Sequence, residues 1–252
     1  MGRVCAVANQ KGGVGKTTTA INLGAYLAAS GRSTLLVDMD PQANATSGLG
    51  FDKMQVSPSI YDALMGQADL GSTVVLTNRV GLDLVPAAIS LAGAEVEMVS
   101  LLAREERLHR ALKKVNDRYD YVLLDCPPSL GLLTVNALTA ADGVIIPIQC
   151  EYLALEGVGQ LVNTIGLIRD NLNPRLRVLG MIMTMYDSRT NLSQQVVAEV
   201  RQYFPALVFE TIVPRSVRLS EAPSYGQSIL DYDPASKGAV AYRMLAEEVM
   251  RR

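Results

Sequence analysis

A glycine-rich run near the amino terminus combines the residue types that bind phosphate groups. It lies between an apolar stretch at 4–8 and a helical pattern at 17–29. The run consists of Gln10, Lys11, Gly12, Gly13, Val14, Gly15, Lys16, Thr17 and Thr18. Glycines let backbone N–H groups turn inward around phosphate oxygens, and the start of a helix adds partial positive charge. In such a loop Lys16 reaches the β- and γ-phosphates and the Thr17 hydroxyl binds Mg²⁺, so the sequence predicts a nucleoside triphosphate site.

The run departs from the usual phosphate-loop pattern, G-x-x-x-x-G-K-[ST], at its first position. Gln10 stands where that pattern has glycine, and a second lysine, Lys11, follows it. One interpretation of Lys11 is an exposed surface lysine, and the other is a second phosphate contact. Because Lys16 already serves the phosphates of its own loop, we expect Lys11 to reach a nucleotide held by another subunit.

Three acidic residues follow two other apolar runs. Asp38 and Asp40 come after 35–37, and Asp125 comes after 121–124. In an open α/β sheet, the ligand lies at the carboxyl ends of the strands, so these acids share a rim with the glycine-rich loop. We expect Asp125 to bind Mg²⁺ through water, and Asp40 to orient or deprotonate an attacking water. Asp38 is expected to contact a Mg²⁺-bound water or the loop. Each acid alone could instead be an N-cap or turn former.

Short apolar runs alternate with longer helical patterns along the chain. This alternation predicts a single α/β doubly wound domain over 1–252, with a mostly parallel sheet flanked by helices. The expected strands are 4–8, 34–37, 82–85, 121–124, 144–148, 178–183 and 208–213. The expected helices are 17–29, 101–115, 134–141, 153–168, 192–203 and 235–250. Residues 43–81 are expected to form loops and short helices over the ligand face.

Composition and charge exclude several classes of protein. Hydrophobic residues make up 49% and charged residues 19%, which excludes intrinsic disorder. No window approaches 18 uninterrupted apolar residues, so no membrane-spanning helix is expected. The three cysteines form no C-x-x-C pair and follow no export signal, which favours buried thiols in a reducing cytosol. The net charge is −2, but residues 169–218 hold seven arginines against four acidic residues. His109 is expected to be exposed.

Several longer motifs together resemble the ParA/Soj family of chromosome- and plasmid-partitioning ATPases, in the wider group that includes MinD. The motifs are KGGVGKTT, VDMDPQANATSGLG, DYVLLDCPPSLGLLTVNAL, PIQCEYLALEG, TMYDSRTNLSQQV and VPRSVRLSEAPSYG. The resemblance runs from Val4 to the final helix. It implies a P-loop fold, ATP and Mg²⁺ as ligands, and an ATP-sandwich homodimer. It also implies non-specific binding of double-stranded DNA, and slow ATP hydrolysis that a ParB-type centromere-binding protein stimulates, in a cytoplasmic, nucleoid-associated protein.

The resemblance assigns roles to individual residues. Lys11 corresponds to the lysine that crosses to the partner's nucleotide, and Gly12 to the close dimer contact. Asp40 corresponds to the residue needed for hydrolysis. The expected ATP-binding residues are Lys11, Gly12, Gly13, Val14, Gly15, Lys16, Thr17, Thr18, Pro214 and Arg215, the last two near adenine. The expected DNA-binding residues are Arg189, Arg218 and Arg201, all within the basic block. For these arginines a solvated face or a carboxylate pair is the alternative.

Two other functions remain open at this point. A MinD-like membrane-positioning ATPase would share the catalytic residues, but the tail AVAYRMLAEEVMRR is expected to be a core helix rather than a membrane anchor. Its buried face is expected to carry Val240, Met244, Leu245 and Val249. A metabolic P-loop enzyme would need an acceptor pocket, and the sequence offers no evident substrate motif. We also expect no helix-turn-helix extension before the first strand.

Overall fold

Eight strands form one sheet in the order β3-β4-β2-β5-β1-β6-β7-β8. The computed structural model describes residues 2–151 and 154–252, and the side chains of these residues except 154–156. The strands are β1 Arg3–Val7, β2 Thr34–Asp38, β3 Val75–Leu76, β4 Leu82–Val85, β5 Tyr121–Asp125, β6 Gly143–Gln149, β7 Arg177–Tyr186 and β8 Val208–Pro214. All neighbouring strands pair in parallel except β3, which is antiparallel to β4. The expected doubly wound, mostly parallel sheet is confirmed.

The central strand β1 is buried on both faces. Val4 and Ala6 pack into one apolar cluster, and Cys5 and Val7 pack into the other. Successive side chains of a strand point to opposite faces, so an uninterrupted apolar run is what a sheet covered on both sides requires. β1 also lies where the winding changes direction, between β5 and β6. A crevice for ligands is expected at the carboxyl end of a strand in this position.

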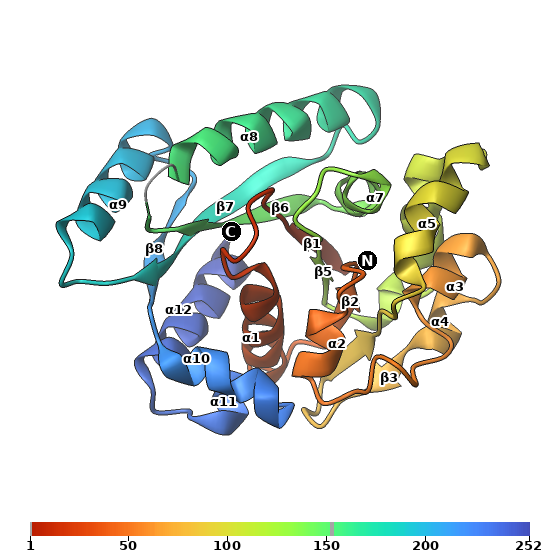
Figure 1. Cartoon of the computed structure of the whole chain (residues 1–252), viewed down its shortest axis with the longest axis horizontal. Coiled ribbons are helices and arrows are strands. Elements are labelled where there is room, and N and C mark those ends of the chain that lie inside the picture. The colour runs from red at the N-terminus through yellow and green to blue at the C-terminus, as the bar shows by residue number, and fades with distance from the viewer. Residues whose placement is uncertain (1, 152–153) are drawn as a thin grey trace.

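Helices cover both faces of the sheet (Figure 1). The helices are α1 Lys16–Ala29, α2 Asn44–Gly48, α3 Ile60–Met65, α4 Leu70–Thr73, α5 Leu91–Glu97, α6 Arg107–Leu112, α7 Leu132–Ala140, α8 Ala154–Asn171, α9 Asn191–Tyr203, α10 Val217–Glu221, α11 Ile229–Tyr232 and α12 Lys237–Arg251. Residues of α1, α2, α11 and α12 join the apolar cluster on one face, and residues of α3 and α5 to α9 join the cluster on the other. The start expected for the fourth helix, residue 153, lies outside the described residues.

Two helix predictions are corrected by the structure. The helix expected over 101–115 is continuous only at α6, and one turn of 3₁₀ helix at Arg104–Glu106 precedes it. The backbone of Ala103 takes a left-handed conformation, with φ of 51°, which ends helical geometry before that turn. In α12 the buried stripe includes Tyr242 as well as Leu245 and Val249, whereas Val240 and Met244 are 39% and 48% exposed. The α12 face was therefore predicted only in part.

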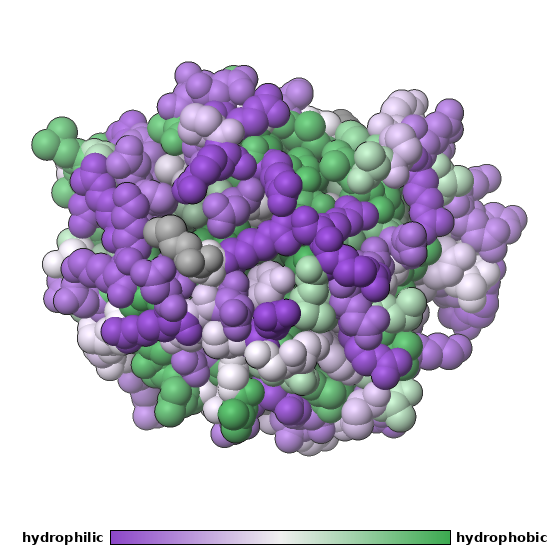
Figure 2. All heavy atoms as spheres, turned by 180° about the vertical axis from the view of Figure 1, so that it is seen from behind, coloured by the Kyte–Doolittle hydropathy of each residue, from purple (hydrophilic) through white to green (hydrophobic). Residues whose placement is uncertain are grey.

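The segment 43–81 contains short helices, as expected, and also the unexpected edge strand β3. Within the described part of the chain, every helix is too short or too polar to span a bilayer. Hydrophilic side chains cover much of the back of the molecule, and apolar atoms there form separate patches (Figure 2). The cysteines Cys5, Cys126 and Cys150 are free and buried, as the sequence predicted.

Candidate nucleotide site

The glycine-rich loop joins the carboxyl end of β1 to the start of α1. Gly13 and Gly15 have φ of 75° and 88°, values that side chains with a Cβ rarely adopt. Gly15 is the N-cap of α1, so the free N–H groups of the first helical turn face the loop. The sequence therefore builds an anion-binding turn at a helix amino terminus, where the expected phosphate loop lies.

Two buried side chains, one from the residue just before the loop and one from β7, hold this loop in shape. The Asn9 amide nitrogen donates to the Pro147 carbonyl at 2.7 Å, and its oxygen accepts from the Lys11 N–H at 3.0 Å. The Thr184 hydroxyl, at the end of β7, donates to the Val14 carbonyl at 2.9 Å. The loop is thus fixed from β6 and β7 as well as from its own strand.

The two lysines of the loop have different environments. Lys16 is only 7% exposed, and its ammonium donates to the Lys11 carbonyl at 3.0 Å. Burial lowers the pKa of Lys16, and the carboxylates of Asp125 and Asp40 oppose that change. Lys11 is exposed and is not among the described residues that line the cavity beside the loop. Lys16 therefore faces the cavity beside the loop, and Lys11 does not.

The three expected acids meet beside Lys16, but in different settings. Both carboxylate oxygens of Asp125 are buried and have no hydrogen-bond partner among the described residues. Burial raises the pKa of Asp125 well above its usual range, and the nearby Asp38 and Asp40 add to this, whereas the Lys16 ammonium opposes it. Asp125 is therefore a buried acid close to Lys16, and both of its oxygens can accept further bonds.

Asp38 is bound to the protein itself. One of its oxygens accepts from the Thr46 N–H at 2.8 Å and from the Thr46 hydroxyl at 2.7 Å. The other accepts from the Asp40 N–H at 3.2 Å. The contact expected between Asp38 and the glycine-rich loop is not among these bonds, and it remains a prediction. The contact of Asp38 with a Mg²⁺-bound water also remains a prediction.

Asp40 lies at the wall of the cavity beside the loop. One carboxylate oxygen accepts from the Gln42 N–H at 2.9 Å, and the residue is 6% exposed. The cavity has a volume of about 520 Å³ and is also bordered by Gly12, Lys16 and Thr17. A carboxylate on this wall can orient a water that enters the cavity.

The donor set fits a Mg²⁺ ion that is shared with a nucleotide. The buried, unpartnered oxygens of Asp125 and the Thr17 hydroxyl beside them are oxygen donors of the kind that Mg²⁺ prefers. Within residues 2–151 and 154–252, no group of three or more His, Cys, Asp or Glu side chains is placed to hold a metal by itself. Phosphate oxygens and water would have to complete the coordination, as is usual for Mg²⁺.

A second cavity of about 480 Å³ lies on the other side of the loop. It shares Gly15 and Thr18 with the first cavity, and it is walled by the segment that includes Pro214 and Arg215. The structure therefore brings these two distant residues close to the phosphate loop, and the adenine contact that the resemblance implies for them remains a prediction. A nucleotide could place its phosphates in the first cavity and its nucleoside in the second.

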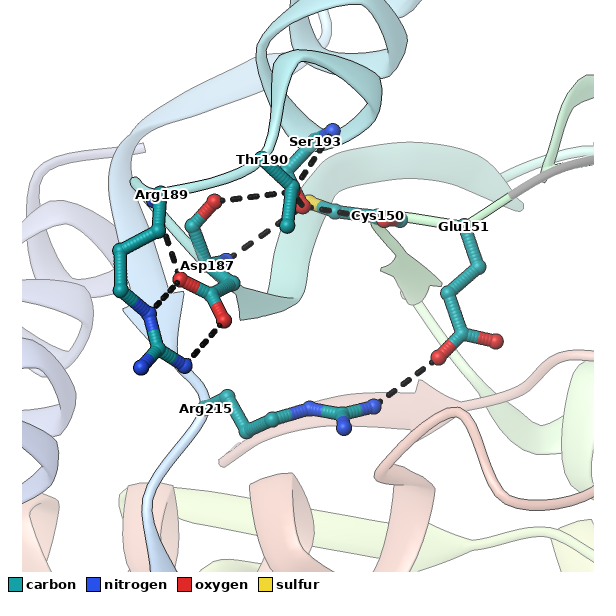
Figure 3. A network of polar contacts seen from close by, with 7 residues as sticks. All are labelled: Cys150, Glu151, Asp187, Arg189, Thr190, Ser193 and Arg215. Atoms are coloured by element: carbon teal, nitrogen blue, oxygen red, sulfur yellow. Dashed lines mark hydrogen bonds and ion pairs between the residues drawn. The ribbon is translucent and has the colours of Figure 1, made fainter.

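Arg189 and Arg215 follow the carboxyl ends of neighbouring strands, where both guanidinium groups are held by acids (Figure 3). The Arg189 guanidinium contacts Asp187 through two bonds of 2.9 and 2.7 Å, and it lowers the pKa of that carboxyl. The Arg189 side chain is 85% exposed. The Arg215 guanidinium donates to Glu151 at 3.0 Å.

The other two candidate DNA-binding arginines lie in helices near opposite ends of β8. Arg218, in α10 just beyond the end of β8, pairs with Glu221 at 3.0 Å and with Asp233 at 3.6 Å. Arg201, in α9, donates to the Glu210 carbonyl at 3.3 Å, toward the start of β8. Arg189 and Arg218 thus both follow strand ends on the rim that carries the phosphate loop, whereas Arg201 lies nearer the opposite end.

A parallel sheet with a phosphate loop after its central strand, and acids after two neighbouring strands, is the arrangement of the P-loop class of nucleotide-binding proteins. A family described as an AAA domain matches residues 2–178. The chain belongs to the ParA/Soj family of partitioning ATPases, as relatives matched over most of their length show.

Three such relatives are bacterial proteins. The sporulation initiation inhibitor protein Soj of Bacillus subtilis is 56% identical, with 99% of this chain and 98% of that protein covered. The chromosome partitioning protein ParA of Myxococcus xanthus is 55% identical, with 100% and 89% covered. The chromosome-partitioning ATPase Soj of Thermus thermophilus is 54% identical, with 99% and 96% covered.

Solved structures agree on the fold. A Mycobacterium smegmatis protein described as cobyrinic acid a,c-diamide synthase, with bound ADP and magnesium, has a TM-score of 0.89 and 44% identity, with 100% of this chain and 95% of that chain covered. The cell division ATPase MinD of Pyrococcus furiosus has a TM-score of 0.82 and 25% identity, with 100% and 99% covered.

Sequence reasoning did not single out several residues of this site. Asn9 and Thr184 hold the loop, and Met185, with φ of 52°, borders both cavities. Thr184 and Met185 stand in the motif TMYDSRTNLSQQV, but a motif does not show which of its residues touches the loop. Asn9 lies between the apolar run of β1 and the loop. An amide side chain at such a position was the one signal in the sequence that could have indicated a residue holding the loop.

Proposed function

We propose that this chain is a partitioning ATPase that takes Mg²⁺ and ATP and works as an ATP-dependent homodimer. The dimer binds double-stranded DNA without sequence preference and leaves it after hydrolysis, which a ParB-type centromere-binding protein stimulates. Residues 1–252 act as one ATPase domain in the cytoplasm, on the nucleoid. Family membership supports the ATPase activity, and the names of the relatives support the partitioning role.

The observation that carries the dimer proposal is the different placement of the two lysines. Lys16 already supplies the cation for its own cavity, and the exposed side chain of Lys11 is free to extend from the loop. Held by the bond from its N–H to Asn9, the Lys11 backbone is fixed while its ammonium can reach a partner's phosphates. Gly12, beside it, is exposed and has open space around its Cα, which suits close approach of a second protomer.

In the proposed reaction each acid has a separate task. Asp40 holds the attacking water against the γ-phosphate, and Lys16 and the crossing Lys11 neutralise the charge that develops there. Thr17 and Asp125 would hold Mg²⁺, which would supply further charge stabilisation at the phosphates. Hydrolysis by one protomer alone is slow because Lys11 acts on the partner's nucleotide.

The DNA-binding role rests on the arginines at the strand ends. Arg189 and Arg218 are exposed, and DNA phosphates would replace their present carboxylate partners, at small cost for the exposed Arg218–Glu221 pair and at a larger cost for the two-bond Arg189–Asp187 pair. One protomer offers few phosphate contacts, and a dimer doubles them. DNA affinity should therefore depend on the ATP-dependent dimer.

The test is binding of the purified protein to random-sequence duplex DNA with ATP and with ADP, at two salt concentrations. We expect binding with ATP only, falling about tenfold for each phosphate contact per tenfold rise in salt. Arg110→Ala is the matched control for Arg189→Ala, because Arg110 is an exposed arginine that also pairs with an acid, Glu106, but lies on α6 and outside the expected DNA-binding set. Binding that is equal with ATP and ADP would refute the switch. ATP binding with no DNA binding would favour a membrane-positioning ATPase, which sedimentation with lipid vesicles would then detect.

Lys16→Ala tests the nucleotide site independently of DNA. Removing the buried ammonium leaves the phosphates without their main side-chain cation, so ATP affinity should fall by at least about tenfold, the equivalent of one charge-assisted hydrogen bond. Isothermal titration with an ATP analogue measures the change. Unaltered affinity would mean that the phosphates bind elsewhere.

A further inference from the structure

A separate cavity of about 270 Å³ opens at the amino end of β1. The phosphate loop follows the other end of the same strand, whose five residues span roughly 17 Å. Residues of α6, of the turn after α7 and of the turn before β7 border it. This cavity therefore lies at the opposite end of the sheet from the nucleotide site, and it takes no part in the proposed reaction.

Cations line the cavity without partners of their own. The Lys113 ammonium and the Arg175 guanidinium make no ion pair with a carboxylate among the described residues, and both side chains are exposed. The one acid on the wall, Asp142, already accepts from the Val4 N–H at 2.9 Å. Arg3 also borders the cavity, but its guanidinium donates to the Val249 carbonyl of α12. The charged side chains on the cavity wall that are left without a protein partner are thus the cations Lys113 and Arg175.

Lys113 is the C-cap residue of α6, but the nearby end of α7 does not explain Arg175. A lysine or arginine beside a helix carboxyl terminus often serves to balance its free carbonyl groups. At the end of α7 that task belongs to Asn173, whose amide donates to the Leu138 and Ala141 carbonyls at 3.1 and 2.7 Å. Arg175, two residues on, is left available for a ligand.

Two further groups give the cavity selectivity. The side-chain oxygen of Asn116 is buried and has no hydrogen-bond partner among the described residues, and the residue is 7% exposed. It can accept a hydrogen bond from a hydroxyl group. His109, half-buried rather than exposed as the sequence suggested, lies on the same wall.

We propose that this cavity binds a small phosphomonoester that carries a free hydroxyl group, at a site separate from that for ATP. Arg175 and Lys113 bind the phosphate, since a guanidinium and an ammonium are the usual phosphate donors in proteins. Asn116 accepts from the hydroxyl. The volume lies near the lower limit for ligand cavities, roughly 300 Å³, which suits a sugar phosphate.

His109 provides a direct probe, because it is the only histidine in the chain. Burial lowers its pKa, Lys113 and Arg175 lower it further, and Glu106 and Asp142 oppose them. A bound phosphate adds negative charge near the ring. If one negative charge lay about 6 Å from the imidazole ring, in a medium with an effective dielectric constant of about 40, it would raise the pKa of His109 by about one pH unit.

The experiment follows the His109 ring by NMR across pH, in untagged protein, with ribose 5-phosphate or ribose at fixed ionic strength. We expect ribose 5-phosphate to raise the pKa of His109 and ribose to leave it unchanged. Arg175→Gln and Lys113→Gln should each abolish the response. Both residues are exposed, so their replacement should not disturb folding.

Lys114→Gln is the matched control. Lys114 follows Lys113 in sequence, but it borders a different cavity, between α6 and the turn after α3, and its ammonium pairs with Asp69. This variant should respond as the wild type does. No shift in the wild type, or the same shift in Arg175→Gln, would overturn the proposal. Because the readout is local to His109, its failure leaves the ATPase proposal untouched.

Discussion

Replacing Asn9 with alanine should weaken the ATP-dependent dimer more than it weakens nucleotide binding. The Asn9 side chain makes two hydrogen bonds, one to the Pro147 carbonyl and one from the Lys11 N–H. Neither contact touches the cavity that would hold the phosphates. The variant therefore tests whether the backbone at Lys11 must be fixed for its ammonium to cross to a partner.

The expected size follows from these two bonds. A typical hydrogen bond contributes about 1 kcal/mol net, and an unsatisfied buried acceptor costs about 1–3 kcal/mol. The buried Pro147 carbonyl loses its partner, so the free energy of unfolding should fall by about 2 kcal/mol. Loss of the bond to Lys11 should cost about 1 kcal/mol per site. A symmetric dimer contains the site twice, so dimerisation should weaken by about 2 kcal/mol, or roughly 30-fold.

Urea denaturation measures the stability, and sedimentation velocity with ATP measures dimerisation. The dimerisation assay is best done with Asp40→Ala in both proteins, so that hydrolysis does not interfere. Asn163→Ala, at an exposed position on α8, is the control and should change neither quantity. If Asn9→Ala lost stability as expected but kept the dimer affinity of its parent, fixing of Lys11 would play no part in dimerisation.

The remaining predictions concern hydrolysis, DNA, the thiols and pH. Asp40→Ala should retain ATP and accumulate as a dimer on gel filtration, and a monomer in the presence of ATP would contradict its role. Arg218→Ala should still dimerise but lose roughly tenfold or more in DNA affinity by mobility shift, in keeping with a lost phosphate contact, and unchanged affinity would remove it from the DNA surface. Burial raises the pKa of Cys5 and Cys150 to about 12, so the thiols should react with an aromatic disulfide at pH 8 only after unfolding, and rapid labelling of the native protein would show that they are accessible. The pKa of His109 lies below its unfolded value of 6.5, so the unfolded chain binds more protons and stability should rise with pH up to about that value. His109→Gln should make the free energy of unfolding, measured by urea denaturation, less dependent on pH in this range. An unaltered pH dependence would mean that other groups cause it.

The nucleotide site could be predicted from sequence where its residues are neighbours along the chain. The glycines, Lys16 and Thr17 form one local turn, and a strand followed by an acid places Asp125 on the same rim by topology alone. The residues that hold this turn in place could not be predicted in the same way. Thr184 contacts a residue 170 positions away, and only the order of strands brings the two together.

The helix over 101–115 shows another limit of the pattern. Leu101, Leu108 and Leu112 have helical spacing, but spacing does not reveal that Ala103 leaves the helical region of backbone conformation. In α12, small residues such as Ala241 and Ala246 occupy the buried stripe, and they permit close packing against α1. Ranking residues by hydrophobicity therefore favoured Val240 and Met244, which face outward.

The segment from Val213 to Ser220 borders the second cavity and also contains Arg218. Under the proposed function, the same eight-residue stretch contacts the nucleoside and holds a DNA-binding arginine. Natural or designed substitutions there will seldom change one property alone. Selection for a different nucleotide preference would also change the affinity for DNA, and selection for tighter DNA binding would also change the affinity for the nucleotide. This stretch should therefore vary little among working copies, and paired changes within it should be more readily tolerated than single ones.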